Sequence, residues 1–287
     1  MIRFGPSGND ELFYEQGHKH TEEAPEWLRG LGLSAYEYSF GRGVRVGEEK
    51  ARLFSEVFPA SGVALSVHAP YFINLAVNDA ERIEKNIGYF VDSAKAAKLM
   101  GAKRMVFHPG AVTKMERAQA MEYARPLLRR IIGELDAAGL GEITLCAETM
   151  GKINQLGTLD EVIELCGVDG RLLPCVDFGH LYARSRGEFN GYDCYKNALD
   201  ALENGVGRER MKNMHIHFSH IAFTAAGEKM HTTLDDDKWG PDWEPLAQAL
   251  SEKDAEPVVI SESKGTMARD SAKMLDIYNK VRNGIHE

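Results

Sequence analysis

The sequence predicts a (β/α)₈ barrel built as a single domain over residues 1–287. Strand-like and helix-like segments alternate along the whole chain, as a barrel of this kind requires. The length of 287 residues is close to the roughly 250 that such barrels use in one domain. No linker rich in Pro, Gly or Ser divides the chain, and no GxGxxG motif follows the first strand, which disfavours an open doubly wound sheet.

Eight short segments rich in β-branched, aromatic and other apolar residues predict buried parallel strands. Eight is the number of strands that closes a barrel of this type, so we expect all eight to pair in parallel inside a ring of helices. The predicted strands are residues 2–7, 35–40, 64–70, 103–110, 142–149, 172–179, 212–220 and 257–263.

Three of the segments between these strands show helical periodicity. Residues 79–100, 115–138 and 266–284 each place apolar side chains on one stripe, which predicts helices packed against the barrel. Pro126 lies inside the second segment, and we expect it to kink or split that helix because proline lacks a backbone N–H.

Composition and charge narrow the class of protein. Hydrophobic residues make up 44 % of the chain and the net charge is −9, which is ordinary for a globular protein and disfavours one that coats nucleic acid. The four cysteines show no CxxC spacing, so neither a disulfide framework nor a thiolate zinc site is indicated. Without a long apolar run or a signal-peptide core, we expect a cytoplasmic protein with no membrane attachment.

Six consecutive predicted strands end in a side chain that can bind a metal ion. In a barrel, the C-terminal ends of the strands form one catalytic face, so these side chains should converge there. The candidates are His68, His108, Glu148, Asp177, His180, His215, His217 and Glu262, and the segment after the seventh strand adds Glu228 and His231.

Converging carboxylates repel one another unless cations lie between them. Imidazole and carboxylate together suit zinc, and also manganese or iron, and more than four candidate ligands predict more than one ion. Glu148, midway through the set, could bridge two ions, which would polarise a phosphoryl group and generate hydroxide near neutral pH. Taken singly, Glu148 and Glu262 could instead pair with Lys or Arg, and Asp177 could cap the following helix.

Several motifs resemble those of the endonuclease IV family, in the same order along the chain. This family comprises metal-dependent apurinic/apyrimidinic endonucleases of the xylose-isomerase-like barrel superfamily. The resemblance implies a barrel that holds up to three zinc ions and cleaves DNA 5′ to abasic sites through attack by a metal-bridged hydroxide. The motifs are SVHAPYFINL (66–75), MVFHPG (105–110), AETMGKINQLG (147–157), CVDFGHLYA (175–183), MHIHFS (214–219), GEKMH (227–231) and SES (261–263).

The resemblance also implies roles for individual residues. Glu148 and Glu262 would be the catalytic carboxylates, and Tyr71 and Phe72 would enter the DNA at the lesion as an aromatic and apolar wedge. The first ion would be held by His68, His108 and Glu148, the second by Glu148, Asp177, one histidine of the seventh strand and Glu262, and the third by His180 and His231.

The chain departs from the family pattern at three places: the first strand, IRFGPSGND, lacks the usual histidine- and serine-containing opening, the usual asparagine after the histidine of the seventh strand is missing, and the segment after that strand differs. Lys229 stands where the family usually has an acidic residue two positions before His231, so either Glu228 substitutes for it after a small backbone shift, or the third metal ion is absent or weakly bound. Either His215 or His217 could be the ligand of the seventh strand, because alternate residues of a strand share a face.

A sugar isomerase or epimerase on the same scaffold is the alternative function. One divalent ion would hold the substrate oxygens while Glu148 and Glu262 move a proton, which needs fewer histidines than this chain supplies. For the nuclease we expect a monomer with DNA as its partner and no protein partner. Local positive charge for DNA would come from Lys114, Arg117, Lys152, Arg184 and Arg186.

Overall fold

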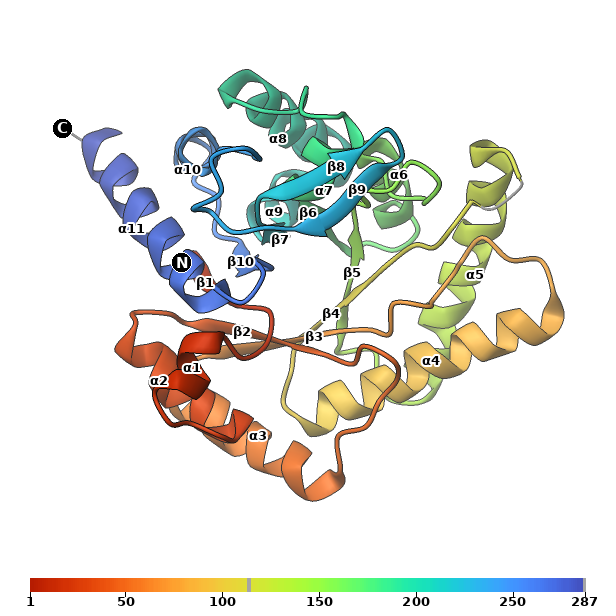
Figure 1. Cartoon of the computed structure of the whole chain (residues 1–287). Coiled ribbons are helices and arrows are strands. Elements are labelled where there is room, and N and C mark those ends of the chain that lie inside the picture. The colour runs from red at the N-terminus through yellow and green to blue at the C-terminus, as the bar shows by residue number, and fades with distance from the viewer. Residues whose placement is uncertain (113–114, 286–287) are drawn as a thin grey trace.

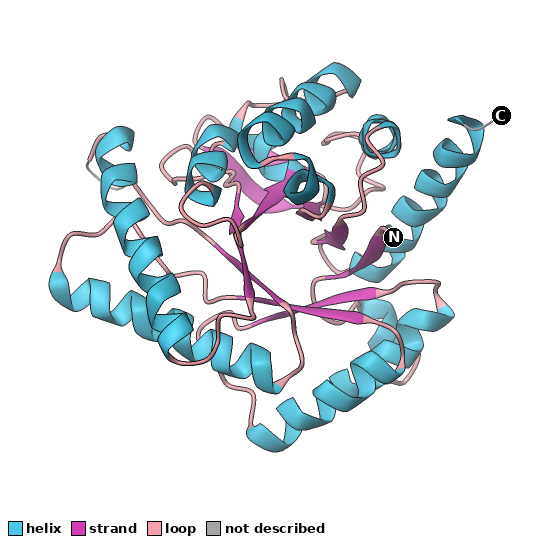
Figure 2. Ribbon diagram, turned by 180° about the vertical axis from the view of Figure 1, so that it is seen from behind, coloured by secondary structure: helices cyan, strands magenta, loops and turns pink. Residues whose placement is uncertain are grey.

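Eight parallel strands form the barrel at the centre of the molecule (Figures 1 and 2). The structure is a computed structural model that describes residues 1–112 and 115–285. All eight predicted strands are confirmed, each shorter than predicted, and those predicted at 103–110 and 212–220 by about half. In their order around the sheet they are β1 (Arg3–Pro6), β10 (Val258–Ser261), β7 (His215–Phe218), β6 (Leu173–Asp177), β5 (Thr144–Glu148), β4 (Arg104–Phe107), β3 (Ala64–His68) and β2 (Ala35–Ser39).

The first and second strands close the barrel. Ser7, just beyond β1, forms a parallel bridge with Glu37 of β2, and the amide of Ser34 donates to the carbonyl of Phe4 at 3.0 Å. Gly5 permits this approach, since a Cβ there would lie 1.7 Å from the carbonyl oxygen of Ala35. Only glycine fits where two backbones come so close.

Helices surround the strands on the outside (Figure 2). The predicted helices at 79–100, 115–138 and 266–284 are confirmed as α4, α5 and α11. They belong to the series α1 (Glu11–Glu15), η1 (Thr21–Glu23), α2 (Ala24–Gly30), α3 (Glu48–Ala60), α4 (Ala80–Leu99), α5 (Arg117–Ala137), α6 (Leu159–Cys166), α7 (Phe178–Arg184), α8 (Tyr192–Val206), α9 (Arg208–Lys212), α10 (Trp243–Glu252) and α11 (Met267–Ile285).

The expectation that Pro126 splits its helix is wrong, because α5 continues through it. Pro126 and Glu122, whose carbonyl loses its helical partner, are both exposed to solvent. Water can therefore satisfy the freed carbonyl, which allows the helix to continue past the proline.

An antiparallel hairpin follows β7 and was not predicted. Its strands, β8 (Ile221–Thr224) and β9 (Gly227–His231), lie apart from the barrel sheet, beside α7 (Figure 1). The segment GEKMH, which the sequence places in a loop, is the second strand of this hairpin. Glu228 and His231 are therefore both on β9, and the positions of their side chains depend on how β9 pairs with β8, not on the pairing of the barrel strands.

The apolar core lies between the strands and the helices, and Phe90 of α4 and Phe107 of β4 pack there with ring centroids 5.1 Å apart. The inside of the barrel, by contrast, contains polar side chains such as Glu37, Ser66 and His215, all buried. Over the described part of the chain, no helix is both long and apolar enough to cross a membrane.

Candidate metal centre

Glu148 lies at the centre of the candidate site, at the end of β5, and is fully buried. Its Oε2 is 3.0 Å from Nε2 of His68 and 3.1 Å from Nε2 of His108. Its Oε1 is 3.2 Å from Nδ1 of His217 and 3.4 Å from Nδ1 of His180. The two oxygens face different pairs of imidazoles, which is the arrangement of a carboxylate that can bridge two cations.

The predicted ligands come together at the mouth of the barrel, which we define as the C-terminal ends of its strands. His108 joins them through its contact with Glu148. Among the residues that the structure describes, the ion-pair partners of Glu148, Asp177 and Glu262 are histidines, not Lys or Arg. Among the described residues, three groups made up of predicted ligands alone have donor atoms within 4.8 Å of one another, namely His68, Glu148 and His217; Glu148, Asp177, His217 and Glu262; and His180, Glu228 and His231; a fourth group joins Cys175 to His215 and His217.

Hydrogen bonds orient the histidine rings toward this cluster. Nδ1 of His68 lies 2.8 Å from the carbonyl oxygen of Ala69, and Nδ1 of His180 lies 2.9 Å from that of Thr149. When Nδ1 carries the proton and donates it to the carbonyl, Nε2 is left with a lone pair that faces the other donors. Ligating histidines in metalloproteins are commonly held in this way.

Asp177 both caps a helix and offers an oxygen to the site. Its Oδ1 accepts a hydrogen bond from the backbone N–H of His180 at 2.7 Å, at the start of α7, so the predicted cap is present. Its Oδ2 is buried and has no hydrogen-bond partner among the described residues. A buried carboxylate oxygen without a donor is costly, and a cation would satisfy it.

Without a metal ion, the charges of the site are balanced by protons. Burial alone would raise the pKa of Glu148, but His108 and His217 hold it well below its usual range. Burial alone would lower the pKa of His68, but the adjacent Glu148 raises it to about 9. Burial raises the pKa of Asp177. The site therefore holds protons that a cation would displace.

A bulge in the hairpin brings Glu228 into the third group. Ala222 pairs with Met230 and the next residue, Phe223, pairs with Glu228, so Lys229 is the extra residue of β9. The extra residue shifts the alternation by one, so that Glu228 and His231 face the same side although they are three positions apart. Nε2 of His180 lies 3.4 Å from Oε2 of Glu228. The bulge thus accompanies a placement of Glu228 within reach of both His180 and His231.

The structure separates the two candidate histidines of β7. His217 reaches Glu148 and also lies 3.7 Å from Oε1 of Glu262. His215 points into the barrel too, but its Nε2 lies 3.0 Å from Glu37 on β2. Sequence reasoning missed Glu37, although a lone acidic residue within the apolar strand AYEYSF signals a buried carboxylate.

The loop after β5, residues 150–157, is held by two of the cations that were expected to face DNA. Arg117 donates to the carbonyls of Ile153 and Gln155 and pairs with Glu161, and Arg184 donates to the carbonyls of Met150 and Lys152. These two guanidinium groups therefore stabilise the backbone of this loop. Lys152 lines the cleft at the mouth. Lys114 lies outside the described residues.

A cleft of about 350 Å³ opens over the metal-capable side chains and includes Tyr71 and Lys152 in its wall. Tyr71 is 55 % exposed and Phe72 is 39 % exposed. The ring of Phe72 packs against Tyr89, with centroids 4.6 Å apart. Tyr71 thus lines the cleft, Phe72 lies next to Tyr71 with ring centroids 5.6 Å apart, and both side chains are exposed.

Comparison with known proteins identifies the family. The model of the family described as xylose isomerase-like TIM barrel matches residues 25–278. Uncharacterized protein MJ0133 of Methanocaldococcus jannaschii is 35% identical over 259 residues, covering 90% of this chain and 92% of that protein. Endonuclease 4 of Thermus thermophilus is 30% identical over 213 residues, covering 71% of this chain and 73% of that protein.

Solved structures share the whole fold. An endonuclease IV from Thermus thermophilus superposes with a TM-score of 0.67 at 22% identity, covering 98% of this chain and 99% of that one. A D-tagatose 3-epimerase-like protein superposes with a TM-score of 0.73 at 17% identity, covering 100% of both chains. A fold shared at such identities does not select a reaction. The chain belongs to the xylose isomerase-like TIM barrel family, as a divergent relative of endonuclease IV.

Proposed function

We propose that this protein is a metal-dependent phosphodiesterase that cleaves DNA 5′ to abasic sites. The observation that carries the proposal is the placement of Glu148, whose two oxygens face separate pairs of imidazoles within a larger set of donors. The similarity to proteins named endonuclease 4 supports a DNA substrate. A barrel mouth with three groups of donors suits a reaction in which charge develops on several phosphate oxygens.

The donor set fits two or three zinc ions, and also manganese or iron, because it combines imidazole and carboxylate without thiolate. His68, His108 and Glu148 would hold the first ion. Glu148, Asp177, His217 and Glu262 would hold the second, and His180, Glu228 and His231 the third. When bound, such ions polarise a phosphodiester and acidify water at neutral pH.

Side chains of the protein can position the attacking water molecule and contact the DNA. Glu262 lines the cleft, and although burial raises its pKa, His217 and His231 lower it overall. Its carboxylate is therefore ionised and can orient a water molecule beside the phosphorus by accepting a hydrogen bond. Tyr71 and Phe72 supply apolar surface that can replace a missing base in the stack, and Lys152 can contact a phosphate.

A sugar isomerase or epimerase remains the competing function, since the same fold occurs in a protein titled D-tagatose 3-epimerase-like. That reaction needs one ion and two carboxylates, so it would use the group around Glu148 and Glu262 alone. It gives no role to the group formed by His180, Glu228 and His231 or to the exposed aromatic residues of the rim. These features favour the nuclease.

The deciding experiment presents both substrate classes to the metal-loaded protein. A 5′-labelled duplex with one abasic site, the same duplex without the lesion, and a panel of ketoses and aldoses are incubated in parallel. We expect a single cut on the 5′ side of the lesion, no cut in the intact duplex, and at least two ions per chain by elemental analysis. Sugar interconversion without cleavage would overturn the proposal in favour of the isomerase.

A further inference from the structure

A second polar layer lies inside the barrel, beneath the ligands of the mouth. It consists of Glu37 on β2, Ser66 on β3 and His215 on β7, which we call the floor. Glu37 and His215 are fully buried and Ser66 is 3 % exposed. Since β2 and β7 are not neighbours in the sheet, the contact between Glu37 and His215 crosses the inside of the barrel.

The floor touches the metal centre through His217. Oε1 of Glu37 lies 2.9 Å from Nε2 of His217, and its Oε2 lies 3.0 Å from Nε2 of His215. The hydroxyl of Ser66 donates to the same Oε2 at 2.8 Å. The other ring nitrogen of His217, Nδ1, faces Oε1 of Glu148 and Oε1 of Glu262. The imidazole of His217 thus spans the space between one carboxylate below and two above.

We infer that Glu37 is a positioning residue for His217, holding its ring with Nδ1 toward the mouth, and that His215 is a partner of Glu37 and not a metal ligand. A histidine binds an ion through one nitrogen, and a carboxylate close to the other nitrogen sets the orientation of the ring and increases its basicity as a ligand. The inference rests on the metal centre of the proposed function, but not on DNA as the substrate.

The charge balance of the floor supports this role. A buried carboxylate without a cationic partner is strongly disfavoured, and among the described residues no Lys or Arg pairs with Glu37. The groups that face its two oxygens are the imidazole of His217 at 2.9 Å from Oε1, and the imidazole of His215 at 3.0 Å and the hydroxyl of Ser66 at 2.8 Å from Oε2. Of the two imidazoles, only that of His217 also reaches the carboxylates of the mouth, so Glu37 is linked to the metal centre through His217.

A competing assignment uses the same residues as ligands. Cys175 on β6 offers a sulfur that lies within 4.8 Å of a nitrogen from His215 and one from His217. In that case the floor would hold an ion of its own. The two assignments differ in what His215→Asn and Cys175→Ser do to the number of bound ions.

The test measures Co²⁺ binding without DNA, by competition with a chelator and by the visible absorption of the bound ion. For Glu37→Gln, which keeps the volume of the side chain, we expect about 10- to 100-fold weaker binding of one ion and a changed absorption band. Asp10→Asn is the matched control, since Asp10 is equally buried but, within residues 1–112 and 115–285, accepts hydrogen bonds only from the backbone amides of Leu12, Ala268 and Arg269. It should leave affinity and spectrum unchanged.

Unchanged binding and an unchanged spectrum in Glu37→Gln would overturn the positioning role. His215→Asn and Cys175→Ser provide the second test, which stands even if Glu37→Gln does not fold. Both should keep the wild-type number of ions per chain, and the loss of one ion in either would assign the floor as a metal site. Because no readout involves DNA, failure of the nuclease assay would leave this result standing.

Discussion

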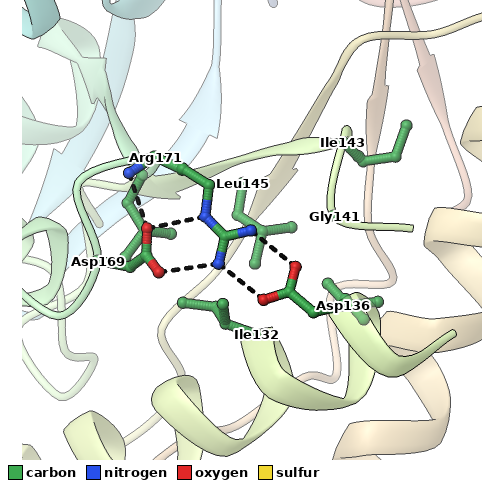
Figure 3. Close-up of a pocket in the computed structure, with 9 residues that line it drawn as sticks. Ile132, Asp136, Gly141, Ile143, Leu145, Asp169 and Arg171 are labelled. Atoms are coloured by element: carbon green, nitrogen blue, oxygen red, sulfur yellow. Dashed lines mark hydrogen bonds and ion pairs between the residues drawn. The ribbon is translucent and has the colours of Figure 1, made fainter. Parts of the chain in front are cut away.

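The carboxylates at the two ends of the barrel have different partners, an arginine at one end and histidines at the other. At the N-terminal end of the strands, Arg171 lies between two carboxylates, donating to Asp136 at 2.7 and 2.9 Å and to Asp169 at 2.9 and 3.0 Å (Figure 3). At the mouth, Glu148, Asp177 and Glu262 face imidazoles. Arg171 is half-exposed, whereas Glu148 and Asp177 are fully buried.

This difference separates a structural role from a functional one. The cluster of Asp136, Asp169 and Arg171 carries its own permanent cation and links the end of α5 to the segment before β6. The mouth carries its negative charge with groups that can lose protons, so its balance changes when a metal ion binds. A cluster of carboxylates therefore indicates a metal site when its partners are histidines, which can lose their protons to make room for a metal ion, and not when its partner is a permanent cation such as Arg171.

Replacing Glu148 should give the largest effect. Glu148→Gln removes the carboxylate shared by two of the donor groups, so we expect loss of at least one ion and about a 10³-fold or greater fall in cleavage rate, the scale of several kcal/mol supplied by bound ions. Elemental analysis and cleavage of the abasic duplex check this. Wild-type turnover with full metal content would contradict the bridging role.

A methyl group at Gly151 should damage one group of donors only. A Cβ at this position would lie 2.6 Å from Cβ of Glu228 and 2.9 Å from Cδ2 of His180, so Gly151→Ala must displace the third group. We expect one ion fewer per chain by elemental analysis. Gly133→Ala, in open space on α5, is the control and should bind the wild-type number. Equal metal content in both variants would show that the third group holds no ion.

Metal affinity should rise with pH. The pKa of His68 is raised to about 9 in the metal-free protein, so between pH 6.5 and about 9 this ring holds a proton that binding must displace. Each displaced proton increases affinity by up to about tenfold per pH unit in this window, and the rise should level off above it. Chelator competition at pH 6, 7, 8 and 9 measures the slope, and a flat profile would refute the assignment.

The raised pKa of His68 also predicts how the stability of the metal-free protein depends on pH. Because the pKa of His68 is higher in the folded protein than in the unfolded chain, protonation of this ring stabilises the folded state. The stabilisation is complete below pH 6.5, the pKa in the unfolded chain, and is lost as the pH rises through about 9. Metal-free protein should therefore lose thermal stability across this range more than metal-loaded protein does. Equal losses would place the responsible protons elsewhere.

Loss of an aromatic residue at the rim should weaken DNA binding without affecting the metal. Phe72→Ala removes one stacking surface, which is worth about tenfold in affinity for the abasic duplex. Leu53→Ala on α3 is the control, because Leu53 is 37 % exposed, close to the 39 % of Phe72, but lies on an outer helix. Equal affinity of the two variants for the duplex would exclude a wedge at Phe72.

The smallest effect should come from the opposite end of the barrel. Arg171→Ala breaks a solvent-exposed cluster, so we expect Tm to fall by about 2 °C and metal content to stay unchanged. Arg171 lowers the pKa of Asp169 to about 2, so its stabilisation is present above pH 4 and is lost as the pH falls toward 2. The difference in Tm should therefore vanish in acid, and a difference that persists would point to lost packing.

Much of the site could be predicted because barrel geometry is regular. Once the eight strands were recognised, residues at or just beyond their C-terminal ends had to meet, which brings His68 and His108 to Glu148 from three different βα units. Hydrophobic period and strand length carry this information locally. Contacts set by single residues did not follow from such patterns.

Three features of the site could be found only from the three-dimensional structure. His215 and His217 share a face of β7, so only their depth in the barrel shows which one reaches Glu148. The bulge at Lys229 depends on the pairing of two hairpin strands, and pairing register is not written in either strand alone. Glu37 meets His215 across the barrel from a strand that is not its neighbour.

The sequence by itself determined the barrel, the end of it at which metal-capable side chains gather and the kinds of atoms available there, because strand period and residue type are local properties. The tertiary structure alone decided which atoms touch, which cations were already committed to the loop after β5, and how the buried acids are arranged in two layers. Those outcomes depend on distances between strands that lie far apart in the chain, and closure of the barrel sets these distances.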